Sequence, residues 1–211
     1  MKSMKLVVLG ATGGTGLELV RQGVERGHVV TALVRSPEKL NGFRDRIIVK
    51  KGNLLDCATL TDTIQDHDAV LSGFGPRLPV SKEDAHLLQQ FALALTRAMS
   101  QARVRRVIVE SVAFLFKNSV MPPAYLLGKL LFPGIVADAS EMERIFAESD
   151  LDWTMVRPPE LTDKPYTGNY RMQEGRLPRF GFTVSRADVA DYMIRAAETH
   201  SSIRKVVGIC N

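Results

Sequence analysis

The stretch Lys5-Leu-Val-Val-Leu-Gly10-Ala-Thr-Gly-Gly-Thr-Gly16 decides the fold. Leu6 to Leu9 are all valine or leucine, which is typical of a strand buried on both faces. Glycines follow at Gly10, Gly13 and Gly16, and apolar residues then recur at helical spacing from about Gly14 to Arg26. The stretch therefore predicts a buried strand, a tight turn and an amphipathic helix.

The rest of the chain continues this alternation. The pattern predicts strands at 28–34, 46–50, 69–72, 106–110, 153–156 and 205–209, and helices at 81–101 and 185–198. Such alternation, with right-handed crossovers, predicts an α/β fold: a Rossmann-type doubly wound parallel sheet covered on both faces. We expect a single domain over residues 1–211, with an irregular substrate-side loop region at 157–183 that forms a small C-terminal lobe.

Composition excludes several classes of protein. The chain has 211 residues, 45% of them hydrophobic, and a net charge of +5, so it is neither disordered nor collagen-like. No apolar run approaches the roughly 20 residues of a membrane span, and the basic residues are dispersed rather than gathered into a nucleic-acid surface. Cys57 and Cys210 form no disulfide framework and no metal site. We expect a cytoplasmic protein, monomeric or weakly dimeric, that binds a small molecule and neither nucleic acid nor membrane.

The glycine turn has the pattern of a dinucleotide diphosphate site. Gly10 permits the tight turn, Gly13 lets the backbone approach a pyrophosphate, and Gly16 lets the helix pack close to the sheet. Unpaired N–H groups at the start of the helix attract phosphate, and the hydroxyls of Thr12 and Thr15 can add hydrogen bonds. The alternative is a glycine-rich turn that holds no ligand.

The end of the second strand indicates which dinucleotide is bound. An NAD site usually has an acidic residue there, whereas this chain has Arg35 followed by Ser36. A guanidinium pairs with the 2′-phosphate that a carboxylate would repel. Arg35 therefore favours NADP(H), with Ser36 and Lys39 as further contacts. The alternative is a solvated charge at the end of a strand.

The glycine turn and the end of the second strand resemble those of a known family. Two further stretches share this resemblance: Gly73-Phe-Gly-Pro-Arg77 and Trp153-Thr-Met-Val-Arg157-Pro-Pro. They resemble the atypical short-chain dehydrogenase/reductases, in particular the NAD(P)H-binding proteins similar to biliverdin reductase B, or flavin reductase, with their NmrA-like relatives. The resemblance extends from Met4 to about Val206. It implies a set of cofactor-binding residues that comprises Gly10, Thr12, Gly13, Gly14, Thr15, Gly16, Arg35, Ser36, Asn53, Leu54, Gly73, Phe74, Gly75, Arg77, Ser111 and Pro158.

The resemblance also implies roles for these positions. Asn53 and Leu54 would lie against the adenine, and the segment from Gly73 to Arg77 under the nicotinamide ribose and phosphates. Ser111 would lie beside the nicotinamide as the catalytic residue, and Pro158 would border the substrate cleft. Glu160 departs from the flavin reductases, which tend to have histidine at this position.

The function that the resemblance implies is an NADPH-dependent oxidoreductase acting on a flat conjugated acceptor: a flavin, a quinone or a tetrapyrrole-like molecule. Hydride transfer to such an acceptor depends on stacking and orientation more than on a protein acid. Aromatic side chains are candidates for an apolar wall against the acceptor, with plain core packing as the alternative: Phe114, Phe116, Phe132 and Tyr166.

Two other functions stay open. Tyr125 and Lys129 have the Tyr-x-x-x-Lys spacing of ordinary short-chain dehydrogenases, in which lysine lowers the pKa of a catalytic tyrosine, so a dehydrogenase or epimerase is possible. The prolines that flank the pair argue against the long helix on which it normally lies. NmrA-like relatives instead suggest a redox sensor that binds NADP(H) without turning it over.

Overall fold

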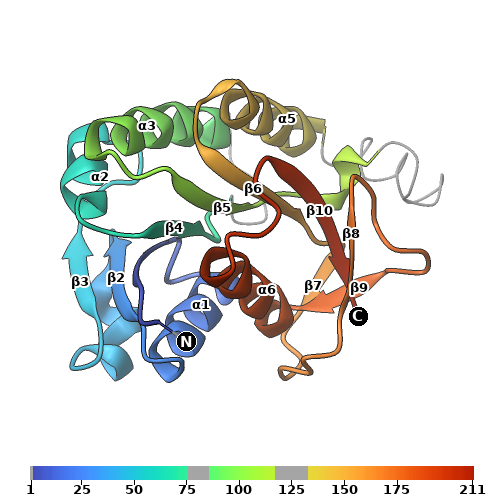
Figure 1. Ribbon diagram of the computed structural model, residues 1–211, viewed down its shortest axis with the longest axis horizontal. Helices are drawn as coiled ribbons and strands as arrows, with labels where there is room; N and C mark the ends of the chain where they lie inside the picture. Colours follow the sequence, from blue (N-terminus) through green and yellow to red (C-terminus); the bar gives the residue numbers. More distant parts are fainter. Residues whose placement is uncertain (1, 76–85, 117–132) are drawn as a thin grey trace.

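The structure is an α/β fold built on one large sheet (Figure 1). It is a computed structural model that describes residues 2–75, 86–116 and 133–211. The strands of the large sheet are β1 (Lys5–Leu9), β2 (Val29–Val34), β3 (Ile48–Lys51), β4 (Ala69–Ser72), β5 (Arg106–Glu110), β6 (Asp152–Arg157), β8 (Arg171–Glu174) and β10 (Lys205–Cys210). The helices are α1 (Gly14–Glu25), η1 (Pro37–Phe43), α2 (Cys57–Ile64), α3 (Leu87–Ala102), η3 (Ala113–Leu115), α5 (Pro133–Glu148) and α6 (Arg186–Glu198).

The strand order is that of a doubly wound sheet. It runs β3-β2-β1-β4-β5-β6-β10-β8, so the chain starts in the middle and reverses direction across the sheet between β1 and β4. The neighbours from β3 to β10 are parallel, and β8 alone is antiparallel to its partner β10. The predicted fold class is therefore confirmed, and the strands at Lys5–Leu9, Ala69–Ser72 and Arg106–Glu110 have the predicted bounds.

Helices cover both faces of the sheet (Figure 1). Helices α1 and α6 pack together on one face, and α2, α3 and α5 pack side by side on the other. In β1, Leu6 and Val8 join the core on the α1/α6 face, while Val7 and Leu9 join the core on the opposite face. A strand with both faces buried reads as a continuous apolar run, which explains why β1 was recognisable from sequence.

The segment 157–183 differs from the predicted irregular loop. It contains β8, and a second sheet in which β7 (Glu160–Thr162) pairs in parallel with β9 (Thr183–Ser185). The short strand β8 is largely exposed, so it has no apolar alternation for a pattern to reveal. Its pairing with β10, from Val207 opposite Glu174 to Cys210 opposite Arg171, makes it a strand.

The histidine His28 lies between α1 and β2 and makes two polar contacts. Its side chain is buried at the junction of α1 and β2. The backbone N–H of Met4 donates to His28 Nδ1 over 3.2 Å, and His28 Nε2 lies 2.9 Å from Glu198 Oε1. This histidine therefore ties the start of the chain to the end of α6.

The carboxylate of Asp188 anchors the C-terminal lobe to α6. The Ser185 hydroxyl accepts from the Asp188 N–H at 3.0 Å and so caps the start of this helix. The buried carboxylate accepts from the backbone N–H groups of Thr167 and Gly168, both at 3.0 Å, and from the Asn211 amide at 2.8 Å. Burial raises the pKa of Asp188, but the bonds from Asn211, Thr167, Ser185 and Gly168 outweigh it and hold that pKa below 3.8.

The variant Asp188→Ala should lower the free energy of unfolding by about 2–4 kcal/mol, because it leaves several donors without an acceptor, among them the buried Ser185 hydroxyl. A carboxyl group whose pKa is lowered by folding stabilises the protein at pH values above its unfolded-state pKa. That stabilisation is lost as the pH falls through the pKa of the folded state. The difference between wild type and variant, measured by urea unfolding, should therefore shrink in acid. Asp62→Ala, at an exposed carboxylate on α2, is the control. Equal effects of the two variants would contradict the anchoring role.

Candidate functional site

The carboxyl edge of the sheet gathers the loops in which the site residues were predicted. The Gly73 N–H, after β4, donates to Leu9 O at 3.1 Å, and the Ser111 N–H, after β5, donates to Val156 O at 2.7 Å. The Ala113 N–H donates to Pro158 O, after β6, at 3.1 Å. The ends of β1, β4, β5 and β6 are thus joined laterally. This edge, near the switch in strand order, is where open parallel sheets bind ligands.

The glycine turn after β1 fits closely against the loop after β4. Gly10 has φ +74°, and a Cβ on it would lie 2.8 Å from the Gly73 carbonyl carbon and from Phe74 Cα. A Cβ on Gly16 would lie 2.0 Å from Gly10 O, so the helix approaches the strand more closely than any side chain allows. The Gly13 N–H donates to Gly10 O at 2.9 Å and closes the turn. Only glycine satisfies these approaches at Gly10 and Gly16.

The start of α1 suits a phosphate group. Its first intrahelical bond joins Leu17 N–H to Gly13 O at 2.9 Å, so the N–H groups of Gly14, Thr15 and Gly16 precede it. Within the described residues, no group accepts from these three N–H groups. Gly13 and Gly14 are exposed, which leaves the backbone accessible to a ligand. Such a helix end, with its partial positive charge, fits the diphosphate of a dinucleotide.

Two charged residues that the sequence analysis missed also lie at this turn. A Cβ on Gly73 would lie 3.5 Å from Glu110 Oε2, and a Cβ on Gly14 would lie 2.4 Å from Arg186 Cδ. Burial raises the pKa of Glu110 to about 7, against the lowering effects of a hydrogen bond with Thr15 and of the Arg186 charge. The position of Glu110, directly before Ser111, was the one available signal for it. Arg186 had none, because it reaches the turn from a distant helix.

The predicted catalytic residue Ser111 belongs to a buried cluster. Ser111 is 7% exposed, and its hydroxyl donates to Glu143 Oε1 at 2.5 Å. Arg157 donates through Nε to the same oxygen at 2.9 Å and through a second nitrogen to Glu143 Oε2 at 2.5 Å. The Arg157 guanidinium also lies 4.5 Å from the centre of the Phe116 ring. Glu143 comes from α5, a helix that the sequence analysis did not predict.

The residues predicted at the adenine end lie in two environments. Arg35 and Ser36 are exposed directly after β2, and Asn53 is exposed after β3, where its Oδ1 accepts from Leu55 N–H at 3.1 Å. Leu54 is 7% exposed and packs in the core on the α2/α3 face, so its side chain offers little surface to a base. The binding roles of these residues stay predictions.

Several other predicted residues can be placed only in part. Phe74 packs on Phe91, with ring centres 4.8 Å apart, and Gly75 is exposed. The Tyr166 hydroxyl is directed at Asp191 on α6, whereas Phe116 is buried beside Arg157; this arrangement contradicts one aromatic wall built from both. Four further candidates lie outside the described residues: Arg77, Tyr125, Lys129 and Phe132.

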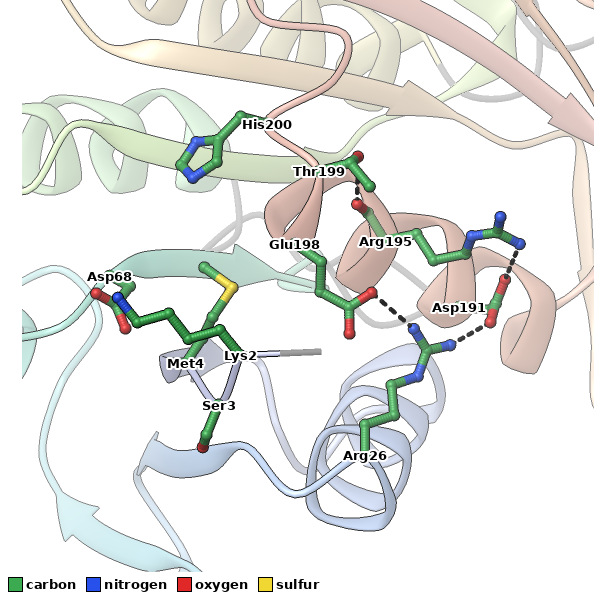
Figure 2. Close-up of a pocket in the computed structure, with 10 residues that line it drawn as sticks. All are labelled: Lys2, Ser3, Met4, Arg26, Asp68, Asp191, Arg195, Glu198, Thr199 and His200. Carbon is green, nitrogen blue, oxygen red and sulfur yellow. Dashed lines mark hydrogen bonds and ion pairs between the residues drawn. The ribbon is translucent and has the colours of Figure 1, made fainter.

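A pocket of about 710 Å³ lies at the opposite, amino edge of the sheet, between α1 and α6 (Figure 2). Two of its carboxylates share one partner: Arg26 contacts both Asp191 and Glu198. Because these carboxylates already have a partner in the protein, we interpret the pocket as part of the packing between α1 and α6. The glycine turn lies at the opposite, carboxyl edge of the sheet.

The comparison with known proteins supports this assignment. A protein-family model described as NAD(P)H-binding matches residues 10–200. The chain belongs to this NAD(P)H-binding family. The match starts at the first glycine of the turn and extends through α6, so it includes both the glycine turn and the C-terminal lobe. The predicted resemblance to NAD(P)H-binding proteins is confirmed.

Similar proteins come from plants and bacteria. A chloroplastic Arabidopsis thaliana protein of uncharacterised function is 30% identical over 99% of this chain and 77% of its own length. The photosystem II assembly factor Ycf39 of Synechocystis is 24% identical over 96% of this chain, and the chain spans 61% of the length of Ycf39.

Solved structures show the same fold. A Veillonella parvula short-chain dehydrogenase/reductase in complex with NADP has a TM-score of 0.79 at 19% identity, with 100% of this chain and 95% of that chain covered. A Streptococcus pneumoniae protein whose name assigns it as an NADH-flavin reductase has a TM-score of 0.81 at 23% identity, with 99% and 100% covered. At such identities the likeness concerns the fold alone.

No helix in ranges 2–75, 86–116 and 133–211 has the length and apolar character to cross a bilayer. The same residues contain no group of three or more His, Cys, Asp or Glu side chains placed to hold a metal ion.

The variant Glu110→Gln tests the half-buried carboxyl group beside the turn. Folding raises the pKa of Glu110 from 4.5 to about 7, so between these values the folded protein holds a proton that the unfolded chain has released. Stability from this group is therefore lost as the pH rises through that window. We expect the variant to be more stable than wild type by about 1–3 kcal/mol at about pH 8, and little changed at about pH 4.5.

Urea unfolding of both proteins at the two pH values measures this difference. Glu174→Gln, at an exposed carboxylate that pairs with Lys205 on the sheet edge, is the matched control and should show no such pH-dependent gain. A gain of the same size in acid and in alkali would refute the role assigned to ionisation.

Proposed function

We propose that this protein is an NADPH-dependent reductase that transfers hydride to a flat conjugated acceptor such as a flavin, a quinone or a tetrapyrrole-like molecule. The observation that carries the coenzyme assignment is Arg35, exposed directly after β2, where NAD sites usually have an acidic residue. The V. parvula relative in fold is a complex with NADP, which supports this coenzyme, and the S. pneumoniae relative is named for flavin reduction with NADH, which supports the type of acceptor.

The residues of the chain would divide the binding between them. The N–H groups of Gly14, Thr15 and Gly16 would hold the diphosphate, and Arg35 would pair with the 2′-phosphate. When bound, the nicotinamide supplies the hydride. The chain would then orient the reactants and exclude water, rather than supply a covalent intermediate.

The hydroxyl of Ser111 would orient the nicotinamide. Since its proton is donated to Glu143, Ser111 Oγ is left with lone pairs that accept a hydrogen bond. A hydrogen-bond acceptor at this position could accept from the N–H₂ group of the coenzyme carboxamide. Arg157 neutralises Glu143, so the carboxylate can remain buried and hold Ser111 in one rotamer.

One relative favours a second candidate. Ycf39 is named as an assembly factor rather than as an enzyme, so this chain is alternatively a non-catalytic NADP(H)-binding regulator that reports the state of the dinucleotide to a protein partner. The two functions share the phosphate cradle and Arg35, and they differ only in turnover. The low cysteine content, Cys57 and Cys210, supports a cytoplasmic location for either.

Steady-state oxidation of NADPH, followed at its nicotinamide absorbance, separates the two candidates. With FMN, dichloroindophenol or menadione as acceptor, we expect turnover well above the rate without protein, and a loss of that turnover in Ser111→Ala. Tight binding of NADP without turnover of any acceptor would favour the regulator. Absence of binding and of turnover would refute both.

The variant Arg35→Ala tests the coenzyme preference. Loss of a hydrogen bond to a charged group should weaken NADPH binding by about 1–3 kcal/mol and leave NADH binding nearly unchanged. Fluorescence titration of both reduced coenzymes measures this. Arg97→Ala, at an exposed arginine on α3 near the amino edge, makes the same change of net charge and should affect neither coenzyme. An equal loss for NADPH and NADH would contradict the assigned role.

A further inference from the structure

The side chain of Arg186 lies across the start of α1. A Cβ on Gly14 would come within 2.4 Å of Arg186 Cδ and 2.6 Å of Arg186 Nε. Gly14 is the first residue of α1, and Arg186 is the first residue of α6. The C-terminal half of the chain therefore delivers a positive charge to the phosphate cradle that the glycine turn forms.

The present partner of this guanidinium is a carboxylate that solvent can replace. Arg186 Nη1 donates to Asp163 Oδ1 at 2.7 Å, while the Asp163 side chain is 89% exposed and that of Arg186 28% exposed. Exposed ion pairs of this kind contribute little free energy, so a stronger anion can displace Asp163 at small cost. Glu110 also faces Arg186.

The local topology places this ion pair at one end of a strand pair. Asp163 directly follows β7 and Arg186 directly follows β9, and these strands are paired, with Thr162 opposite Ser185. The ion pair therefore closes the end of the small sheet that faces the turn. An anion that binds Arg186 in place of Asp163 therefore removes a contact of the segment that begins at Asp163.

We propose that Arg186 binds the diphosphate of the coenzyme and exchanges Asp163 for it. This inference rests on the proposed function, because it requires a dinucleotide at the glycine turn. A guanidinium can donate two parallel hydrogen bonds to phosphate oxygens, and it carries a full positive charge. The backbone N–H groups of α1 also donate hydrogen bonds, but they carry only partial charges. Arg186 thereby links coenzyme binding to the segment between β7 and α6.

Calorimetric titration with NADP⁺ and with NAD⁺ tests the assignment. In Arg186→Gln, both affinities should fall by about tenfold or more, the scale of one charge-assisted hydrogen bond. The loss should be equal for the two coenzymes, because both contain the diphosphate. Arg186→Lys, which keeps the charge and loses the planar fork, should recover part of the affinity. Thermal unfolding of each variant verifies that the protein is folded.

The competing carboxylate gives a second, opposite effect. Asp163→Asn should tighten the binding of both coenzymes by about two- to fivefold, because Arg186 no longer has to leave a partner. In the Arg186→Gln background the same substitution should have no effect. Asp62→Asn, at a similarly exposed carboxylate that pairs with Lys50, is the control and should change neither affinity.

The outcomes separate this inference from the proposed function. If the wild-type protein binds neither coenzyme, the proposed function fails, and the inference fails with it. If the wild type binds and folded Arg186→Gln binds equally well, the role of Arg186 is overturned while the proposed function stands. An effect of Asp163→Asn that persists without Arg186 would also overturn the exchange.

Discussion

The close approach of two backbone segments, the glycine turn after β1 and the loop after β4, is the constraint on which the site depends. With φ +74° at Gly10 and no room for a Cβ at Gly10 or Gly16, α1 starts directly at the end of β1. This geometry leaves the first N–H groups of α1 at the carboxyl edge of the sheet. The neighbouring strand ends carry Arg35 and Ser111 to the same edge, because parallel strands end together.

The two edges of the sheet use charge differently. At the amino edge, Arg26 has Asp191 and Glu198 as partners, and these contacts hold α1 to α6. At the carboxyl edge, Glu143 is neutralised by Arg157, and desolvation raises the pKa of Glu110 to about 7, so these two side chains contribute less net negative charge. Arg35, exposed at this edge, adds positive charge. An edge with this balance of charge is suited to an anionic ligand.

How far the sequence predicts this arrangement depends on the range of the interactions. The strand–turn–helix around Gly10 is local, so apolar runs and glycine spacing were sufficient to predict it. Helix α5 was missed, although Val136, Ala139, Met142 and Phe146 recur at helical spacing, and Glu143 was missed with it. Arg186 at the turn and the β8–β10 pairing result from contacts between distant segments, for which a single sequence contains no pattern.

The anchors of the C-terminal lobe determine what kind of response a ligand at the turn can produce. The Asp188 carboxylate bonds to Thr167, Gly168 and Asn211, and the Ser185 hydroxyl caps α6, so the backbone at Arg186 is held on both sides. Those bonds are buried or half-buried, whereas the bond between Arg186 and Asp163 is exposed. Exchange of a partner at the exposed bond therefore costs far less than a movement of α6. A side-chain rearrangement, with the helix in place, is the response that this architecture favours.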